Sequence, residues 1–214
     1  VKGGASRAQA GLWLPGNLIE VRWVARLSDQ LGSLSGELVH PAAALAMDEP
    51  LALALLSSAC AIAADALPER EAHPRAFAGL VSLIGHLAGG AEGVVADYVR
   101  FEALILAELG YGLDLAACAV TGVSEGLTHV SPRTGRAVSA GAAAPYLDKL
   151  LPLPGFLRDA ESLGDAAAWA AGLRLTGHFL ERDAFGARHR PVPEARFRLA
   201  ERIAGLNAAP PDNA

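Results

Sequence analysis

The sequence is poor in the residues that mark several classes of protein. It holds 2 cysteines among 214 residues. That is too few for a disulfide framework and suits a reducing compartment such as the cytoplasm. Aromatic residues make up 6% of the chain, whereas 52% of it is hydrophobic, largely alanine and leucine. This composition favours packed helices over a sandwich of β-sheets.

Long apolar runs are also missing. The longest uncharged run near the middle of the chain extends from Leu51 to Ala64 and contains Ser57 and Ser58. A membrane-spanning helix needs about 20 apolar residues, so this run is predicted to be a buried helix, and no membrane partner is expected. There is no signal-peptide pattern and no initiator methionine before Val1, so we expect a cytoplasmic fragment or processed form.

Charge is unevenly spread along the chain, whose net value is −5. Basic residues predominate in the first 26 residues and again between residues 174 and 202, and acidic residues predominate between them. Affinity for phosphate depends on local cation density rather than on the total. The two basic ends therefore leave nucleic-acid binding open, with ordinary surface asymmetry as the alternative.

Two regimes of hydrophobic spacing follow one another. Ile19, Val21 and Trp23 form one apolar face at a period of two after the turn signal Pro15–Asn17, which predicts a strand. A second short strand is expected over residues 32–39. From there on the spacing is helical, and it predicts helices over about 48–67, up to the pair Gly89–Gly90, about 98–109, 143–151, 165–185 and 193–205. Asp48 and Asp165 are expected to cap helices, and Gly110 to end one.

A compact run of turns separates the third of these helices from the fourth. The order is a charged amphipathic helix, YVRFEALILAELG, then turns that include Cys118 and VSPRTGRAVS, then the proline-bounded APYLDKLLPLPGF. This order resembles the C-terminal domain of RecO, the bacterial recombination mediator. LALALLSSACAIAADALPERE resembles its first bundle helix, and LRLTGHFLERDAF its penultimate one. VKGGASR with LWLPGNLIEVRWVARL resembles the middle of its N-terminal OB-fold. The resemblance covers nearly the whole chain, and its strength lies in the ordered set.

The resemblance implies an α+β fold. It places a partial N-terminal OB-fold β-barrel in residues 1–46, an all-α helical bundle with a degenerate zinc-knob insertion in 47–207, and a disordered tail in 208–214. The family's barrel begins with strands that precede the KGG segment, so an open, partly disordered barrel is expected here.

The knob departs from the family pattern at its metal ligands. In many family members it binds zinc through one CxxC pair at each end. Cys118 stands at the first ligand position, but Thr121, Ser139 and Ala142 stand at the other three. A single thiolate cannot complete a four-coordinate zinc site. The resemblance therefore implies a metal-free knob and no cofactor.

The function implied is that of a non-enzymatic DNA-binding recombination mediator in gap repair. Such a protein binds single- and double-stranded DNA, anneals complementary strands, partners RecR, and helps to load RecA onto strands coated by single-strand-binding protein. Its expected place is the cytoplasm, at the nucleoid. The alternative is an all-helical protein–protein adaptor without nucleic-acid binding.

The predicted DNA contacts are cationic side chains in the two parts of the chain that the resemblance assigns to the barrel and the knob. They are Lys2, Arg7, Arg22, Arg26, Arg133 and Arg136. Solvated turn arginines are the alternative for the last two. Trp13 and Trp23 are possible stacking platforms, although Trp23 lies on the apolar face and is predicted to pack in the core. The hypothesis requires the cations to form one continuous positive surface.

Two other signals are set aside. Gly122–Gly126 matches the G-x-S-x-G pattern of hydrolases, but no parallel-sheet pattern surrounds Ser124. His178 is predicted to be a surface or hydrogen-bonded histidine, because no second metal ligand stands one helical turn further on.

Overall fold

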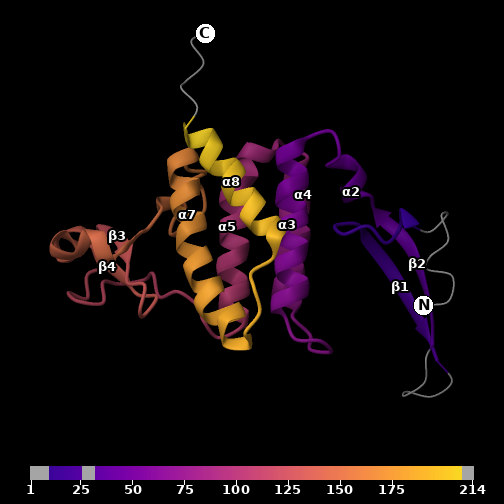
Figure 1. The fold of residues 1–214 in the computed structure, drawn as a ribbon, viewed down its shortest axis with the longest axis horizontal. Coiled ribbons are helices and arrows are strands. Elements are labelled where there is room, and N and C mark those ends of the chain that lie inside the picture. The colour runs from indigo at the N-terminus through magenta and orange to yellow at the C-terminus, as the bar shows by residue number, and fades with distance from the viewer. Residues whose placement is uncertain (1–9, 26–31, 209–214) are drawn as a thin grey trace, which may run out of the picture.

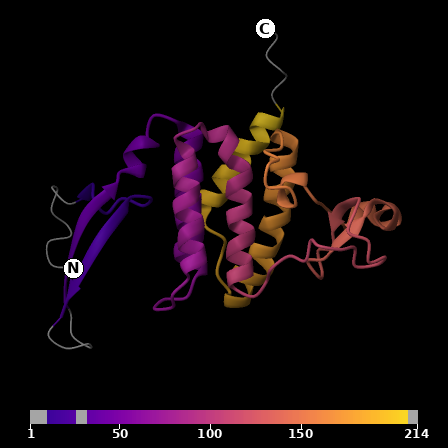
Figure 2. The ribbon, with the colours of Figure 1, turned by 180° about the vertical axis from the view of Figure 1, so that it is seen from behind.

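A helical bundle stands at the centre of the molecule, with a β-hairpin on one side and a small knob on the other (Figure 1). The computed structural model describes residues 10–25 and 32–208. The five long helices are α3 (Pro50–Ala66), α4 (Pro74–Leu87), α5 (Ala91–Glu108), α7 (Ala166–Phe179) and α8 (Glu194–Ala208). Helix α5 packs against α3, α4 and α7, while α8 packs on α3 and α7. Seen from behind, α4 and α5 stand in front of α8 (Figure 2).

Most of the predicted helices are confirmed, with differences at their ends. Helix α3 is capped by Glu49 rather than by Asp48, and the Glu49 carboxylate accepts the backbone N–H of Leu51 at 3.0 Å. Asp165 caps α7 as predicted, accepting the N–H of Ala168 at 2.8 Å. Beyond α7 the chain continues as a π-helix, η3 (Leu180–Phe185), and a 3₁₀ turn, η4 (Gly186–Arg188).

The predicted core helix is confirmed, and a polar cluster lies beside it. Leu55, Ala59 and Ile62 of α3 are fully buried. No helix in the described part of the chain is long and apolar enough to cross a membrane. The buried polar groups of the bundle gather around the carboxylate of Glu102, which is fully buried on α5.

Glu102 joins three helices through this carboxylate. Arg196 of α8 donates to it from Nε at 3.0 Å, Tyr98 donates from its hydroxyl at 2.7 Å, and Thr176 of α7 donates as well. Ser58 of α3 lies 2.6 Å from the Tyr98 oxygen. Burial and the adjacent carboxylate raise the pKa of Tyr98. Burial opposes the charge on Arg196, but Glu102 outweighs it and raises the pKa of the guanidinium. The ion pair between Arg196 and Glu102 fastens α8 to the bundle.

The hairpin consists of β1 (Leu18–Val24) and β2 (Ser33–His40), which pair antiparallel with Val21 opposite Gly36. A short helix, α2 (Ala42–Leu45), connects it to α3. The predicted turn before β1 anchors the hairpin to the bundle. Gly16 has φ +95°, and a Cβ there would meet Leu56 of α3 at 2.6 Å, so only glycine fits. Asn17 Oδ1 accepts the N–H of Ala43 at 3.1 Å.

The apolar face of the hairpin is only thinly covered by described residues. Trp13 is half-buried over this face, where its ring would be 3.0 Å from a Cβ at Gly36. Trp23 is nevertheless 53% exposed. The prediction that Trp23 packs in the core is wrong. A two-stranded hairpin is a single layer, and the described helices leave this side chain half exposed.

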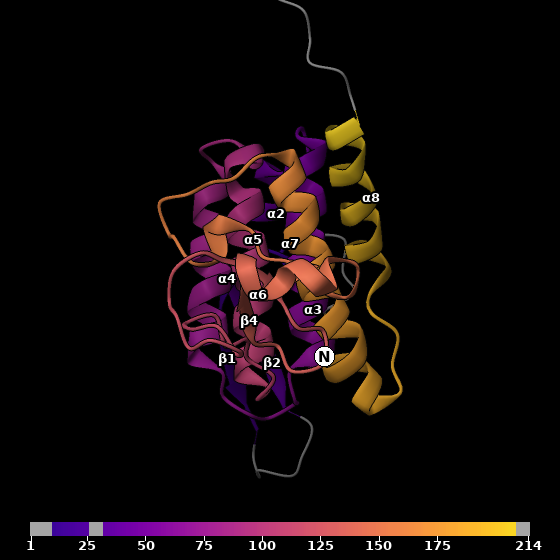
Figure 3. The same ribbon diagram turned by 90° about the vertical axis from the view of Figure 1, so that its left-hand side faces the viewer.

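The knob contains a three-stranded antiparallel sheet in the order β4–β3–β5, formed by β3 (Leu127–Val130), β4 (Ala137–Ser139) and β5 (Leu151–Pro152). The short helix predicted over 143–151 is only partly correct, because the segment is a 3₁₀ helix that ends in a strand. The chain there forms α6 (Ala140–Ala143), a 3₁₀ helix η1 (Ala144–Lys149) with a break at Tyr146, and then β5. A second 3₁₀ turn, η2 (Gly155–Leu157), packs on α5. In the end-on view the knob stands in front of α5 and α7 (Figure 3).

Candidate nucleic-acid interface

The predicted DNA-binding cations divide into three groups. Lys2, Arg7 and Arg26 lie outside the described residues. Arg22 is exposed on β1 of the hairpin, and Arg133 and Arg136 are exposed on the turn that connects β3 to β4 in the knob. The hairpin and the knob lie on opposite sides of the bundle (Figure 1). The described cations therefore do not form the one continuous surface that the hypothesis required.

Arg22 stands among acidic neighbours. Along β1 it shares a face with Glu20, since side chains two residues apart point the same way. Glu37 lies directly opposite Glu20 on β2. Two exposed carboxylates on this face reduce the positive potential around Arg22. By itself, Arg22 is a weaker phosphate contact than its residue type suggests.

The knob turn is closed by its own backbone. Gly135 donates its N–H to the Ser131 carbonyl at 2.9 Å, and Ser131 donates to the Arg136 carbonyl at 2.9 Å. Arg136 Nε lies 3.2 Å from Asp114 Oδ2 in an exposed ion pair. Arg133 at the tip has no ion-pair partner among the described residues. The turn thus presents one unneutralised cation and a second that is paired.

His178 is confirmed as a hydrogen-bonded histidine. Its Nε2 lies 3.0 Å from the carbonyl oxygen of Pro132, in the same knob turn. Arg182 of η3 donates to that oxygen too. These contacts tie the turn that carries Arg133 to the end of α7.

Most arginines of the basic C-terminal stretch bond to the protein itself. Five of the seven between residues 174 and 202 have such partners: Arg182 with Asp183, Arg188 with the Ala66 carbonyl, Arg190 with Asp65, Arg196 with Glu102, and Arg198 with Glu194. Within the described part of the chain, Arg174 and Arg202 have no such partner. The contacts of Arg188, Arg190 and Arg196 reach helices that are distant in sequence, whereas those of Arg182 with Asp183 and Arg198 with Glu194 are local.

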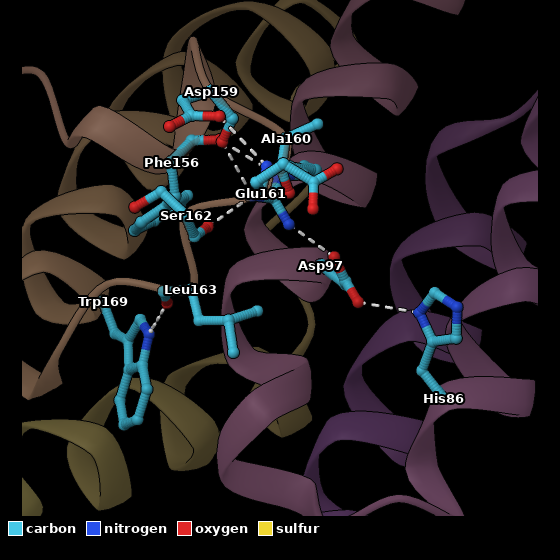
Figure 4. A network of polar contacts seen from close by, with 10 residues as sticks. His86, Asp97, Phe156, Asp159, Ala160, Glu161, Ser162, Leu163 and Trp169 are labelled. Atoms are coloured by element: carbon cyan, nitrogen blue, oxygen red, sulfur yellow. Dashed lines mark hydrogen bonds and ion pairs between the residues drawn. The ribbon is translucent and has the colours of Figure 1, made fainter.

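A further arginine, which the sequence did not single out, holds the loop that leads from the knob back to α7. Arg100 donates to the carbonyls of Phe156 at 3.0 Å and Ser162 at 2.6 Å, and also to those of two residues between them. It bonds Asp97 at 2.5 Å, and Asp97 in turn contacts His86 of α4 at 2.8 Å (Figure 4). Because the acceptors are backbone carbonyls, no residue pattern could have revealed this contact.

Comparison with known proteins decides the family. The family description "Recombination protein O C terminal" matches residues 47–190. The chain is 62% identical to the DNA repair protein RecO of Granulibacter bethesdensis over 207 residues, which are 96% of this chain and 83% of that protein. It is 59% identical to the same protein of Acidiphilium cryptum over 94% of this chain and 81% of that protein.

The chain belongs to the RecO family. The resemblance seen in the sequence is confirmed, and with it the assignment to bacterial DNA repair and recombination. The alternative of an all-helical adaptor is wrong in its fold, since this RecO chain carries strands in both the hairpin and the knob.

The zinc expected in many RecO knobs does not fit these residues. Cys118 is buried, and its Sγ accepts the N–H of Ser139 at 3.3 Å. Hydrogen bonds from Ser139 and Thr121 lower the pKa of the Cys118 thiol to about 6. Ala142 offers no donor atom. The described residues contain no group of three histidine, cysteine or acidic side chains that could hold a metal. In this knob, protein N–H and O–H groups surround the one sulfur.

The G-x-S-x-G pattern has no hydrolase context. Ser124 is exposed in a bend, and no strand leads into it. Its carbonyl accepts a hydrogen bond from Arg158 at 2.7 Å. The bond from Arg158 holds this bend against the segment that follows η2.

Proposed function

We propose that this RecO-family chain binds single- and double-stranded DNA and mediates recombination in gap repair without catalysing a reaction. It anneals complementary strands and, together with RecR, helps to load RecA onto strands coated by single-strand-binding protein. Its place is the cytoplasm, at the nucleoid. Identity of 62% to a DNA repair protein RecO over 96% of the chain supports this role.

The exposed turn with Arg133 and Arg136 is the observation that carries the proposal. A closed, rigid turn loses little conformational freedom when it meets a phosphate backbone. The hairpin is a second and separate contact, with Arg22 on one face and half-exposed Trp23 on the other. We further propose that residues 1–46 form an OB-type β-domain and residues 47–207 the helical one. The thinly covered apolar face of the hairpin supports this division.

The test is binding of the full chain to fluorescently labelled DNA across a salt series. Affinity should fall with salt with a log–log slope of about −0.7 for each phosphate neutralised on single strands and about −0.9 on duplexes. The double variant R133A/R136A should bind more weakly and with a shallower slope. A matched control is R75A/R198A, which also removes two exposed arginines, whose side chains are 72% and 74% exposed.

Equal weakening in the two double variants would assign the effect to total charge and remove the knob turn from the DNA contact. Binding that does not respond to salt would remove the DNA-binding role. The RecR partnership is tested separately by size-exclusion chromatography of the mixed proteins, where two unshifted peaks would contradict it.

A further inference from the structure

The knob turn contacts α7 and η3 through hydrogen bonds to one carbonyl oxygen. The carbonyl oxygen of Pro132 receives two donors, His178 Nε2 at 3.0 Å and Arg182 Nη1. A carbonyl oxygen has two lone pairs, so this acceptor is fully used. Gly135, with φ +69°, sits above the ring of Phe179, and a Cβ there would be 3.6 Å from that ring and 3.3 Å from Leu113.

Arg182 is itself held on several sides. Its guanidinium lies over the Phe179 ring, 4.9 Å from the centroid. Asp183 accepts from its Nε at 2.7 Å and its Nη2 at 2.6 Å. His178 stacks edge-on against the same ring, with centroids 5.0 Å apart. These residues span the change from α-helix to π-helix at Leu180, and π-helical turns often occur where side chains are aimed at a functional site.

We infer that His178 and Arg182 are positioning residues for the DNA contact made by Arg133 and Arg136. The carbonyl they hold belongs to the peptide that joins Pro132 to Arg133. Fixing the plane of that peptide sets the direction in which Arg133 leaves the backbone, because a peptide unit is planar. A turn ordered in advance loses less entropy when it binds phosphate. This inference rests on the proposed function.

The test is a double-mutant cycle on the full chain, read by anisotropy of labelled single-stranded DNA. H178A/R182A should weaken binding by about three- to tenfold, the factor that corresponds to the loss of one hydrogen bond. Its salt slope should become shallower by about 0.7 for each phosphate that is no longer neutralised. H178Q/R182K keeps an N–H donor at both positions and should bind like the unaltered chain. R198A removes the same charge from α8 and is the matched control.

The decisive comparison is made in the R133A/R136A background. There H178A/R182A should have no further effect, since the side chains it positions are gone. If the weakening persists at full size in that background, Arg182 contacts DNA itself or the fold is damaged, and the inference is overturned. Unchanged binding by H178A/R182A overturns it as well.

Failure of the proposed function looks different. In that case the unaltered chain would show no DNA binding that responds to salt, whatever the variants do. If the chain binds DNA and R133A/R136A binds it equally well, the knob turn is not the contact and the inference is overturned. If R133A/R136A binds weakly while H178A/R182A binds normally, the turn contacts DNA but does not need its support from α7.

Discussion

The hairpin and the knob both contain small antiparallel sheets and carry predicted DNA contacts, yet their apolar side chains are buried to very different extents. The hairpin strands are 7 and 8 residues long, and Val21, Trp23 and Val39 are all more than half exposed. The knob strands have 2 to 4 residues, but Val130 and Ala137 are fully buried. Strand length therefore does not decide burial in this protein. What decides it is whether helices cover the sheet.

The largest expected effect concerns the bundle that supports the knob. R196M leaves the buried Glu102 carboxylate without its cation, and breaking a buried ion pair costs about 3–5 kcal/mol. Urea unfolding measures the destabilisation, and R198A, on the exposed side of the same helix, should change stability by less than about 0.5 kcal/mol. Hydrogen exchange should quicken in the knob more than in the hairpin. Equal quickening in both would show that the two regions depend on the bundle alike.

A matched pair of valines tests the comparison directly. V130A removes two buried methyl groups from the knob and should cost about 2 kcal/mol. V21A makes the same chemical change on a hairpin strand where the side chain is 53% exposed, and it should cost about half as much or less. Urea midpoints measure both. A larger cost for V21A would mean that the hairpin face is covered more than its described neighbours indicate.

A further prediction is a pH dependence of the knob. The pKa of the Cys118 thiol is lowered to about 6 from its ordinary value of 9.0, chiefly by the Ser139 hydroxyl. A depressed pKa stabilises the fold above pH 9, and this contribution is lost as the pH falls from 9 towards 6. The melting temperature should therefore decrease over this interval in the unaltered chain and less so in C118A.

Cys60 provides the control for this prediction. Burial in α3 raises the pKa of its thiol from 9.0 to about 11, so the folded chain keeps it protonated between pH 6 and 9, and the unfolded chain ionises it only near pH 9. C60A should keep the pH dependence of the unaltered chain. An identical pH profile in C118A and the unaltered chain would contradict the stabilised thiolate.

Local signals were enough to place the long helices. Caps and stops act within one turn of the chain, so Asp165 and Gly110, which has φ +87°, could be recognised from their neighbours. The knob strands could not, because segments of 2 to 4 residues show no measurable period. The end of the segment at 143–151 was misread for a different reason. Its sequence fits a helix locally, but pairing of Leu151 with Val130 draws its end into the sheet.

By itself the sequence determined the helical bundle and the family. Both follow from ordered local patterns, which can be recognised before any tertiary contact is known. The tertiary structure decided what each charged side chain does. An arginine can donate equally well to a phosphate, a carboxylate or a carbonyl. Arg100, Arg182 and Arg196 meet carbonyls and carboxylates from distant parts of the chain. Arg133 is exposed on a turn whose Pro132 carbonyl contacts His178 of α7.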